Sequence, residues 1–383
     1  MKKPLSIAIV GAGIGGLAAA ALLRRAGHAV RIYEQAAQFA RVGAGIQMAP
    51  NAMKVLRLIG VEQQLIDVAF QAEMALSRAG DSGEPSSELP LGDTVAKQFG
   101  APYLFLHRAD LHAALLTVVP PDVIQLNRKL AGIEQTGGGV VLRFADDTRE
   151  TADAVIGADG VHSLVREIIV GPERPRFTGK VAYRTTFPAS RVQGVTLAPV
   201  RTKWWGPDRH MVVYFVTRKR DELYFVTSVP EKAEWMTPES WSAKGDLDEL
   251  RAAYKGFHPE VQAILQACPE VYKWALFERD PLPRWSDGHV ALLGDACHPM
   301  TPYMAQGAAS ALEDAAILSR LLTGLEREGL PEAFRLYEAI RKPRASAIQA
   351  GSSANTWLKG KTDPAWVYGC DSTTVPLQEP AAA

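Results

Sequence analysis

Three glycines near the N-terminus are spaced as in turns that bind the pyrophosphate of a dinucleotide. Gly11, Gly13 and Gly16 follow the apolar segment 5–10 in a G-x-G-x-x-G pattern that also contains Gly15. The first glycine allows a tight turn, the second lets a pyrophosphate approach the backbone, and the third lets the next helix pack closely. The free N–H groups at the start of that helix favour phosphate. The spacing therefore predicts a dinucleotide site.

An acid stands at the end of the second predicted strand. Residues 17–26 are rich in Ala and Leu and predict a helix that Gly27 ends, and residues 30–33 predict a strand. Glu34 follows, with Gln35 beside it, and we expect both to bind the cofactor. A carboxylate here accepts hydrogen bonds from ribose hydroxyls and repels a 2′-phosphate. The alternative is a glycine-rich turn in an ordinary βαβ unit.

Two later motifs also place an acid where a predicted strand ends. Asp159 and Gly160 follow one apolar strand, and Asp295 follows another. Gly307 then opens a helix whose first N–H groups could face the edge of a flavin ring. Together with the N-terminal turn, these motifs favour FAD over other dinucleotides. The structural alternative is that both acids only cap turns.

His210 and Tyr214 are candidates for chemistry on a substrate. They lie four residues apart on a predicted strand and therefore face the same side. His210 could titrate near neutrality, and Tyr214 could relay a proton. The alternatives are a core histidine and an aromatic side chain that packs in the sheet.

Composition sets limits on the class of protein. The 383 residues are 47% apolar, with 42 basic and 42 acidic side chains. This charge balance does not favour binding to nucleic acid or to a membrane surface. A helix needs about 20 apolar residues to span a bilayer, and no apolar run approaches that length. Cys268, Cys297 and Cys370 are few and widely spaced. We therefore expect reduced thiols in a cytoplasmic protein, and neither a disulfide framework nor a metal site.

The elements that position these residues predict an α/β fold. We expect a Rossmann-like FAD-binding domain of residues 1–174 and 278–383, with C-terminal helices, and an inserted substrate domain of residues 175–277 with a mixed or antiparallel sheet. Predicted helices cover 52–58, 108–118, 308–323 and 332–350. Predicted strands cover 140–144 and 153–156, which return to the first sheet, and 181–187, 210–217 and 222–229, the last two forming a hairpin. We expect the tail after Leu377 to be frayed.

The ordered set of motifs resembles the single-component FAD-dependent aromatic hydroxylases, the class related to 4-hydroxybenzoate and salicylate hydroxylases. The resemblance covers essentially the whole chain and is greatest to the hydroxylases of 6-hydroxynicotinate. The stretches that carry it are RVGAGIQMAPNAMK, KWWGPDRHMVVYFVT, LLGDACHPMTPYMAQGAA and DPAWVYG.

The resemblance implies roles for the cofactor residues. Glu34 would bind the adenosine ribose, and Arg108 would reach the pyrophosphate unless it is only a surface arginine at a helix start. Asp159 would serve both FAD and NAD(P)H. Asp295 would hold the ribitol side of the flavin, and Gly307 would flank the isoalloxazine.

The resemblance also implies the reaction. NADH, or NADPH, docks transiently and reduces FAD, and the reduced flavin takes up O2 to give a hydroperoxide that hydroxylates an electron-rich ring carbon. The substrate would be a small hydroxylated aromatic or pyridine carboxylic acid. In the nicotinate type the oxygen enters where a carboxylate departs. The class contains monomers and homodimers.

The predicted substrate pocket departs from the nicotinate type at three positions. Gln47 replaces His, Arg201 replaces Cys, and Tyr303 replaces His. We expect Gln47, His210 and Tyr214 to take part in catalysis and all five residues to contact substrate. Gln47 cannot act as a base. Either the substrate is a different aromatic acid or Gln47 is an engineered change. Arg201 or Arg184 could pair with a substrate carboxylate.

Three alternatives remain open at this point. The first is a salicylate- or 4-hydroxybenzoate-type hydroxylase that acts on a benzene carboxylic acid. The second is another enzyme of the same fold, such as a flavin epoxidase or N-demethylase. The third is a flavin-binding protein without turnover.

Overall fold

The first sheet forms around the buried apolar strand that precedes the glycine turn. The computed structural model describes residues 3–40, 44–232 and 243–378, so most of the tail expected to fray, and the first three residues of the RVGAGIQMAPNAMK stretch, lie outside the described residues. The strands of this sheet are β1 (Ser6–Val10), β2 (Ala29–Tyr33), β7 (Ile124–Gln125), β11 (Ala154–Gly157), β17 (Ser286–Asp287) and β18 (Val290–Leu292). Their order is β17-β18-β11-β1-β2-β7, and all neighbours are parallel except β17 and β18.

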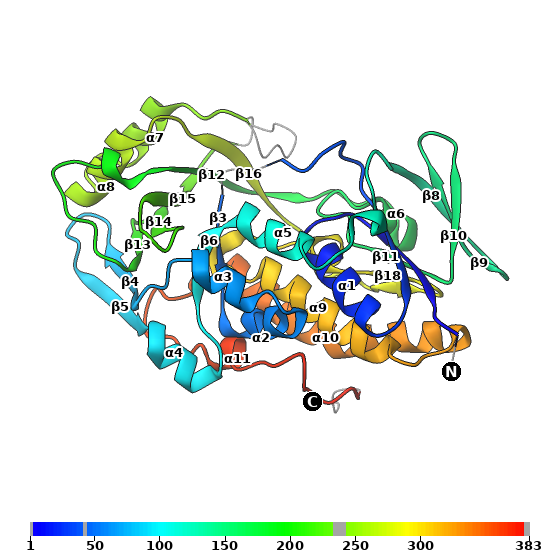
Figure 1. Ribbon diagram of the computed structural model, residues 1–383. Coiled ribbons are helices and arrows are strands. Elements are labelled where there is room, and N and C mark those ends of the chain that lie inside the picture. The colour runs from blue at the N-terminus through cyan, green and yellow to red at the C-terminus, as the bar shows by residue number, and fades with distance from the viewer. Residues whose placement is uncertain (1–2, 41–43, 233–242, 379–383) are drawn as a thin grey trace.

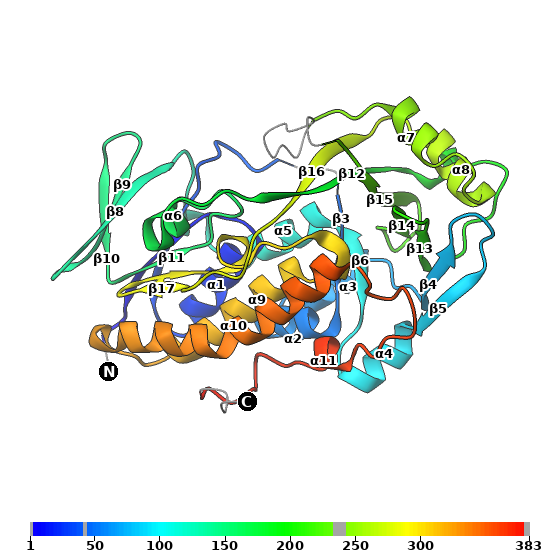
Figure 2. The same cartoon turned by 180° about the vertical axis from the view of Figure 1, so that it is seen from behind.

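Helices pack on this sheet, and two of them, α9 and α10, come from the C-terminal part of the chain. α9 packs against both α1 and α10, and α2 also packs on α9 (Figures 1 and 2). The helices are α1 (Ile14–Arg25), α2 (Pro50–Ile59), α3 (Glu62–Val68), α4 (Gly92–Phe99), α5 (Arg108–Leu116), α6 (Leu164–Val170), α7 (Leu247–Ala253), α8 (Pro259–Ala267), α9 (Gly307–Leu322), α10 (Leu330–Ala354) and α11 (Ala365–Tyr368). The long helices predicted near the C-terminus are therefore α9 and α10.

A seven-stranded sheet forms the other half of the molecule, with α7 and α8 on its outer side (Figure 1). Its strands are β4 (Met74–Ala79), β5 (Pro85–Pro90), β12 (Arg176–Pro188), β13 (Arg201–Trp205), β14 (His210–Phe215), β15 (Glu222–Pro230) and β16 (Tyr272–Glu278). The order is β16-β12-β15-β14-β13-β4-β5, and neighbours are antiparallel except β13 and β4. The predicted hairpin is β14 and β15.

The predicted domain division stays a prediction. The strands of residues 175–277 all lie in the seven-stranded sheet, but β4 and β5 join it from the segment assigned to the first domain. Alternation within a short strand does not identify the sheet that the strand will join, because pairing depends on distant segments.

One predicted strand joins a different sheet from the one expected. The sequence predicts that residues 140–144 return to the first sheet, whereas β9 (Gly139–Phe144) lies between β8 (Leu130–Thr136) and β10 (Arg149–Ala152) in a separate antiparallel sheet. Short turns link β9 to both neighbours, and such turns favour local antiparallel pairing. The remaining strands, β3 (Gly45–Met48) and β6 (Leu104–His107), pair with each other.

The α/β fold class predicted from the sequence is confirmed. Within the described ranges, no helix combines the length and the apolar character needed to cross a membrane. No cluster of three or more His, Cys, Asp or Glu residues suited to a metal ion occurs in the same part of the chain.

Candidate active site

A cavity of about 380 Å³ is lined by residues of both large sheets and their connections. On one side are Gly13 and Asp295, which follow strands of the first sheet, and Arg108, the first residue of α5 after β6. On the other side are Tyr214 of β14 and Arg184 of β12. Ligands of open α/β sheets bind beyond the carboxyl ends of the strands, which is where β1 and β18 deliver their loops.

The glycine turn leaves room at one position and packs tightly at another. A Cβ atom at Gly13 would have no protein atom within 4 Å, whereas a Cβ at Gly16 would lie 2.1 Å from the carbonyl oxygen of Gly11. Gly11 has a φ of +101°, which disfavours any side chain. Gly15 also lines the cavity. The turn thus has the open approach and the close helix packing that a pyrophosphate site needs.

Glu34 holds this turn in place through its carboxylate. Oε2 accepts a hydrogen bond from the backbone N–H of Ala12 at 2.9 Å, and Oε1 accepts one from the N–H of Ala36 at 2.8 Å. Each oxygen keeps a second lone pair that a ribose hydroxyl could use. Gln35 is exposed, and neither Glu34 nor Gln35 lines the cavity.

Asp159 makes the contacts of a structural cap. Its Oδ1 accepts a hydrogen bond from the Ser163 hydroxyl at 2.5 Å, and its Oδ2 accepts one from the N–H of Val165 at 3.2 Å. Burial raises the pKa of this carboxyl, and these hydrogen bonds oppose the rise. Asp159 does not line the cavity, but Gly160 next to it does. The carboxylate therefore fixes the loop that contributes to the wall.

Asp295 and Gly307 lie together in the cavity wall. A Cβ atom at Gly307 would lie 3.8 Å from Oδ1 of Asp295, which is ordinary contact. Gly307 is the first residue of α9, whose initial N–H groups have no partner within the helix. Burial raises the pKa of Asp295, while nearby His298 and Arg108 oppose the rise.

These residues fit a bound flavin dinucleotide. The open backbone at Gly13, the cationic Arg108 and the α1 N-terminus suit the pyrophosphate. The Asp295 carboxylate can accept from a sugar hydroxyl, and the first turn of α9 offers N–H groups to a ring edge.

Gln47 links two tyrosine side chains beside the cavity. Its Oε1 accepts a hydrogen bond from the hydroxyl of Tyr103 at 2.8 Å, and its side chain also contacts the hydroxyl of Tyr214. Burial, with a contribution from Tyr224, raises the pKa of Tyr214 well above its usual value, and Gln47 opposes this rise. Tyr214 therefore stays protonated and can donate a hydrogen bond.

A smaller cavity of about 40 Å³ adjoins the first and contains the other predicted substrate residues. His210, Arg201 and Tyr303 line it, and Gln47 and Ala305 line both cavities. We name this smaller cavity the inner compartment. Ala305 has a φ of +54°, a strained conformation for a residue with a side chain, at the point where the cavities meet.

His210 differs from the expectation that it would titrate near neutrality. Burial, together with the charges of Lys203, Lys180 and Arg201, lowers the pKa of His210 well below its usual value. Its ring lies edge-on to that of Tyr303 at 5.2 Å between centroids, and Tyr303 shares a 2.9 Å hydrogen bond with Ser228. At neutral pH His210 is therefore uncharged.

The structure brings together most of the predicted residues but in three groups. Gly13, Gly15, Arg108, Asp295, Gly307, Gln47 and Tyr214 line the larger cavity; Gln47, His210, Arg201 and Tyr303 line the inner compartment; Gly11, Gly16, Glu34, Gln35 and Asp159 line neither. Sequence reasoning missed Lys203, which is fully buried beside Arg201. The signal was available, since two cations at alternate positions of a strand face the same side.

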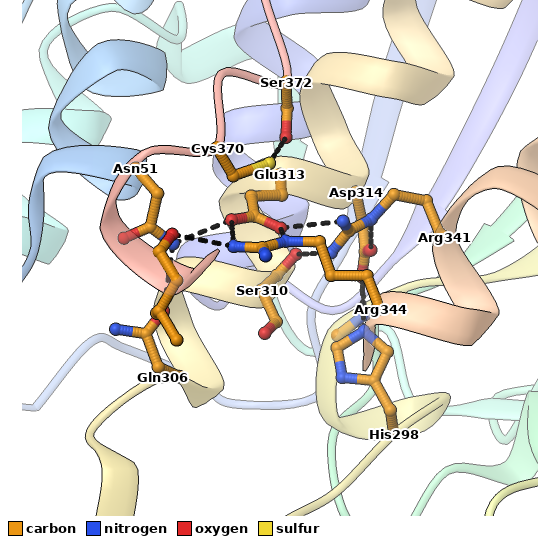
Figure 3. A network of polar contacts seen from close by, with 12 residues as sticks. Asn51, His298, Gln306, Ser310, Glu313, Asp314, Arg341, Arg344, Cys370 and Ser372 are labelled. Atoms are coloured by element: carbon orange, nitrogen blue, oxygen red, sulfur yellow. Dashed lines mark hydrogen bonds and ion pairs between the residues drawn. The ribbon is translucent and has the colours of Figure 1, made fainter. Parts of the chain in front are cut away.

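A buried polar network behind the cavity holds the loop that carries Asp295 (Figure 3). His298 Nε2 lies 2.6 Å from Oδ2 of Asp314, and the same oxygen accepts from the N–H of Gly294 at 3.0 Å. Oδ1 of Asp314 accepts from Nε of Arg341, which also pairs with Glu313, each at 2.7 Å.

The network extends from Glu313 to the far end of the loop and to the C-terminal segment. Arg344 binds both carboxylate oxygens of Glu313 at 2.8 Å, and Arg344 also donates to the carbonyls of Trp366 and Val367. Asn51 donates to Glu313 at 2.7 Å and to Gln306 at 2.9 Å (Figure 3). The loop of residues 294–307 is thus fixed at one end by Asp314 and at the other by Asn51, which is itself bound to Glu313, and the sequence alone did not connect these residues.

Comparisons with known proteins agree with this geometry. Residues 5–352 match the family described as FAD binding domain. The chain is 48% identical over 381 residues to 6-hydroxynicotinate 3-monooxygenase of Pseudomonas fluorescens and 49% identical over 381 residues to the protein of that name from Bordetella bronchiseptica; each alignment covers 99% of this chain and 98% of the relative. A solved salicylate hydroxylase substrate complex has a TM-score of 0.84 at 25% identity, with 99% of both chains covered.

Proposed function

Since the chain belongs to the FAD-binding domain family of flavin-dependent monooxygenases, we propose that it hydroxylates a small hydroxylated aromatic or pyridine carboxylic acid with NAD(P)H and O2. Family membership confirms the resemblance read from the sequence, the enzymatic role and FAD as the cofactor. It sets aside the alternative of a flavin-binding protein without turnover. The relatives named 6-hydroxynicotinate 3-monooxygenase make that acid the first substrate to test.

One observation carries the proposal. A single cavity joins the residues that fit a flavin dinucleotide, such as Gly13 and Asp295, to the polar side chains of Gln47 and Tyr214. An aromatic ring placed between them would meet the cofactor on one side and hydrogen-bonding groups on the other. Such proximity is what oxygen transfer to a ring carbon requires.

FAD, when bound and reduced by NAD(P)H, would activate O2, so that one oxygen atom enters the ring and the other leaves as water. The protein's own residues hold the ring. Tyr214 is protonated and donates a hydrogen bond to a ring oxygen, and the amide of Gln47 orients Tyr214 and Tyr103. Because Gln47 is not a base, it positions groups and removes no proton. Buried aromatic and apolar side chains keep water out of the reaction.

We propose further details that depend on this assignment. NADH is the expected hydride donor, with NADPH as the alternative. With a nicotinate-type acid, oxygen entry at the carbon that carries the carboxylate would release CO2. We propose a cytoplasmic monomer or homodimer.

The proposal is tested by supplying the FAD-loaded protein with NADH and a panel of hydroxylated pyridine and benzene carboxylic acids. The expected result is that at least one acid accelerates NADH oxidation and O2 uptake and yields a product that carries one added oxygen atom, with or without loss of CO2, by mass analysis. A benzene acid as the best substrate would support the salicylate- or 4-hydroxybenzoate-type alternative. Oxidation of NADH with only H2O2 as the product from every acid would contradict the proposal, and an epoxide or an N-demethylated product would point to the other enzymes of this fold.

A further inference from the structure

Two buried cations line the inner compartment without a carboxylate partner. Arg201 is 4% exposed and Lys203 is fully buried, and both project from β13 to the same side. Nε and Nη1 of Arg201 have no hydrogen-bond partner in the described chain. Lys203 Nζ lies 3.5 Å from Oδ1 of Asn355 and 3.8 Å from the centroid of the Trp205 ring. Neither residue forms an ion pair with any acid that the structure describes.

This arrangement is expensive for a folded protein. A buried charge without a counter-charge destabilises the fold because it has lost its hydration. Burial lowers the pKa of Lys203 well below its usual range, and the charges that act on Lys203, from Arg201, Lys180 and Lys359, lower it further. Burial also lowers the pKa of Arg201. A bound anion in the compartment would raise the pKa values of both side chains again. If the two cations had a purely structural role, we would expect a protein carboxylate to pair with them, and no described residue lining the site supplies one.

We propose that the inner compartment is an anion-binding subsite in which Arg201 and Lys203 bind a negatively charged oxygen of the substrate. The proposal deepens the function proposed above and rests on it, because the anion belongs to the ring that the enzyme hydroxylates. It gives these two residues of β13 a role in selecting the substrate. It also explains how a pocket with Gln47 in place of a base can favour an ionised substrate.

The size and position of the compartment define the group that it takes. A volume of about 40 Å³ holds one or two waters, or a carboxylate, but not a ring. Gly13, Arg108 and Asp295 line only the larger cavity. The bound anion therefore points away from the residues that fit FAD, and the ring carbon nearest the cofactor lies remote from it.

Two groups on the substrate share this chemistry. The first is a ring carboxylate, which would then be retained in the product. The second is the ionised ring hydroxyl, whose charge Arg201 and Lys203 would stabilise and which would feed electrons to the opposite ring carbon. Analogues that lack either the carboxylate or the ring hydroxyl distinguish these two possibilities.

The test uses FAD-loaded protein and three probes: 6-hydroxynicotinate, 6-hydroxynicotinamide, which lacks the acid, and nicotinate, which lacks the ring hydroxyl. Dissociation constants are measured from the change in flavin absorbance for the wild type, Lys203→Met and Arg201→Gln. The control is Lys97→Met, which removes an ammonium group whose side chain is 82% exposed. We expect each inner-compartment variant to weaken binding of the preferred probe by about 10- to 100-fold, as for loss of a charged hydrogen bond, and Lys97→Met to change nothing.

The pattern of probes identifies the anion. If nicotinate binds and the amide does not, the carboxylate occupies the compartment. If the amide binds and nicotinate does not, the ring oxygen occupies it, and the bound probe will show the absorbance of its ionised form in the wild type but not in Arg201→Gln. Equal affinity of wild type, Lys203→Met and Arg201→Gln for every probe overturns the proposal.

A stability measurement keeps the inference separate from the proposed function. Lys203→Met removes a buried polar group that no carboxylate compensates, so without ligand we expect its Tm to rise by about 2 °C. If no acid is hydroxylated but Tm rises and 6-hydroxynicotinate affinity falls, the subsite stands and the proposed reaction fails. If acids are hydroxylated but Lys203→Met lowers Tm and leaves affinity unchanged, Lys203 is structural and the subsite is refuted. If no probe binds the wild type, the subsite is refuted as a site for a substrate anion, whatever the Tm of Lys203→Met.

Discussion

The imidazole of His298 and the carboxylate of Asp314 are joined at 2.6 Å in a fully buried pair that ties the loop after β18 to the middle of α9. The same carboxylate oxygen accepts the N–H of Gly294, directly before Asp295. One side chain on a rigid helix thus sets the path of the loop from which Asp295 enters the cavity. Because the loop has little regular structure of its own, the buried polar network fixes its conformation.

We predict that Asp314→Asn lowers both stability and FAD affinity. The amide cannot balance the Arg341 guanidinium, and breaking a buried pair on one side costs about 3 kcal/mol. Urea unfolding of the cofactor-free protein and a fluorescence titration with FAD measure the two effects. The control is Glu332→Gln, which breaks an exposed ion pair with Arg335 and should change stability by less than about 0.5 kcal/mol. Equal behaviour of the two variants would show that the Asp314 network does not support the loop.

The same carboxylate predicts how stability depends on pH. Burial alone would raise the pKa of Asp314, but His298 and Arg341 outweigh it and lower the pKa from 3.8 to about 2. A depressed folded-state pKa gives stability that is complete above about pH 4 and is lost as the pH falls toward 2. We expect about 2 kcal/mol of the unfolding free energy to disappear over this window through Asp314. Asp314→Asn should have a shallower acid limb in urea unfolding at pH 2 to 5, and parallel limbs would refute the assignment.

We predict that Tyr214→Phe binds FAD normally but slows hydroxylation by about tenfold or more, the lower range for a lost proton-handling group. The hydroxyl contacts Gln47 in the cavity, whereas the ring keeps its packing against Phe105 and Tyr224. The measurement is the amount of product formed per NADH consumed. A poorly positioned ring is not hydroxylated, and the reducing power of the flavin then goes into forming H2O2. Tyr272→Phe, on the edge strand β16, is the matched control. A wild-type ratio of product to NADH in Tyr214→Phe would remove Tyr214 from the mechanism.

Two alanine substitutions in the glycine turn should separate cofactor binding from folding. Gly13→Ala adds a methyl group that meets no protein atom within 4 Å but projects into the space that a pyrophosphate would use, so FAD affinity falls while stability is kept. Gly16→Ala places a methyl group 2.1 Å from the Gly11 carbonyl and should cost about 1–3 kcal/mol. Chemical unfolding without FAD and FAD titration of both variants make the comparison. A Gly13→Ala protein that binds FAD as tightly as the wild type would place the pyrophosphate elsewhere.

Local sequence patterns were sufficient to predict the first elements of the fold. The apolar run of β1, the glycine turn and the Ala- and Leu-rich α1 each have strong local preferences that agree, so tertiary contacts had nothing to override. The β14–β15 hairpin was equally clear from alternation around a polar turn. The sheet that takes up β9 was not, because an apolar strand can pair with any neighbour of matching register and only the fold selects one.

The candidate site shows the same limit. Asp295 and Gly307 were found because they stand at the ends of regular elements. The arginine partners of Glu313 and Asp314 come from a helix more than 25 residues away, and no sequence periodicity predicts such pairs. Lys203 was missed because a strand lysine is usually exposed. Alternation puts it on the same side of the strand as Arg201, but only the folded structure shows that this side is buried.

The wall of the inner compartment is completed by Trp357 and Leu358, which follow α10 near the end of the chain. Ribosomes synthesise a protein from its N-terminus, so the glycine turn is made before this wall. A prematurely terminated product that stops before residue 355 would retain the phosphate-binding turn and yet leave Arg201 and Lys203 open to solvent. The order of synthesis therefore delays closure of the compartment until residues 357 and 358 have been made, and a chain that stops before them would be poorly able to shelter reactive oxygen.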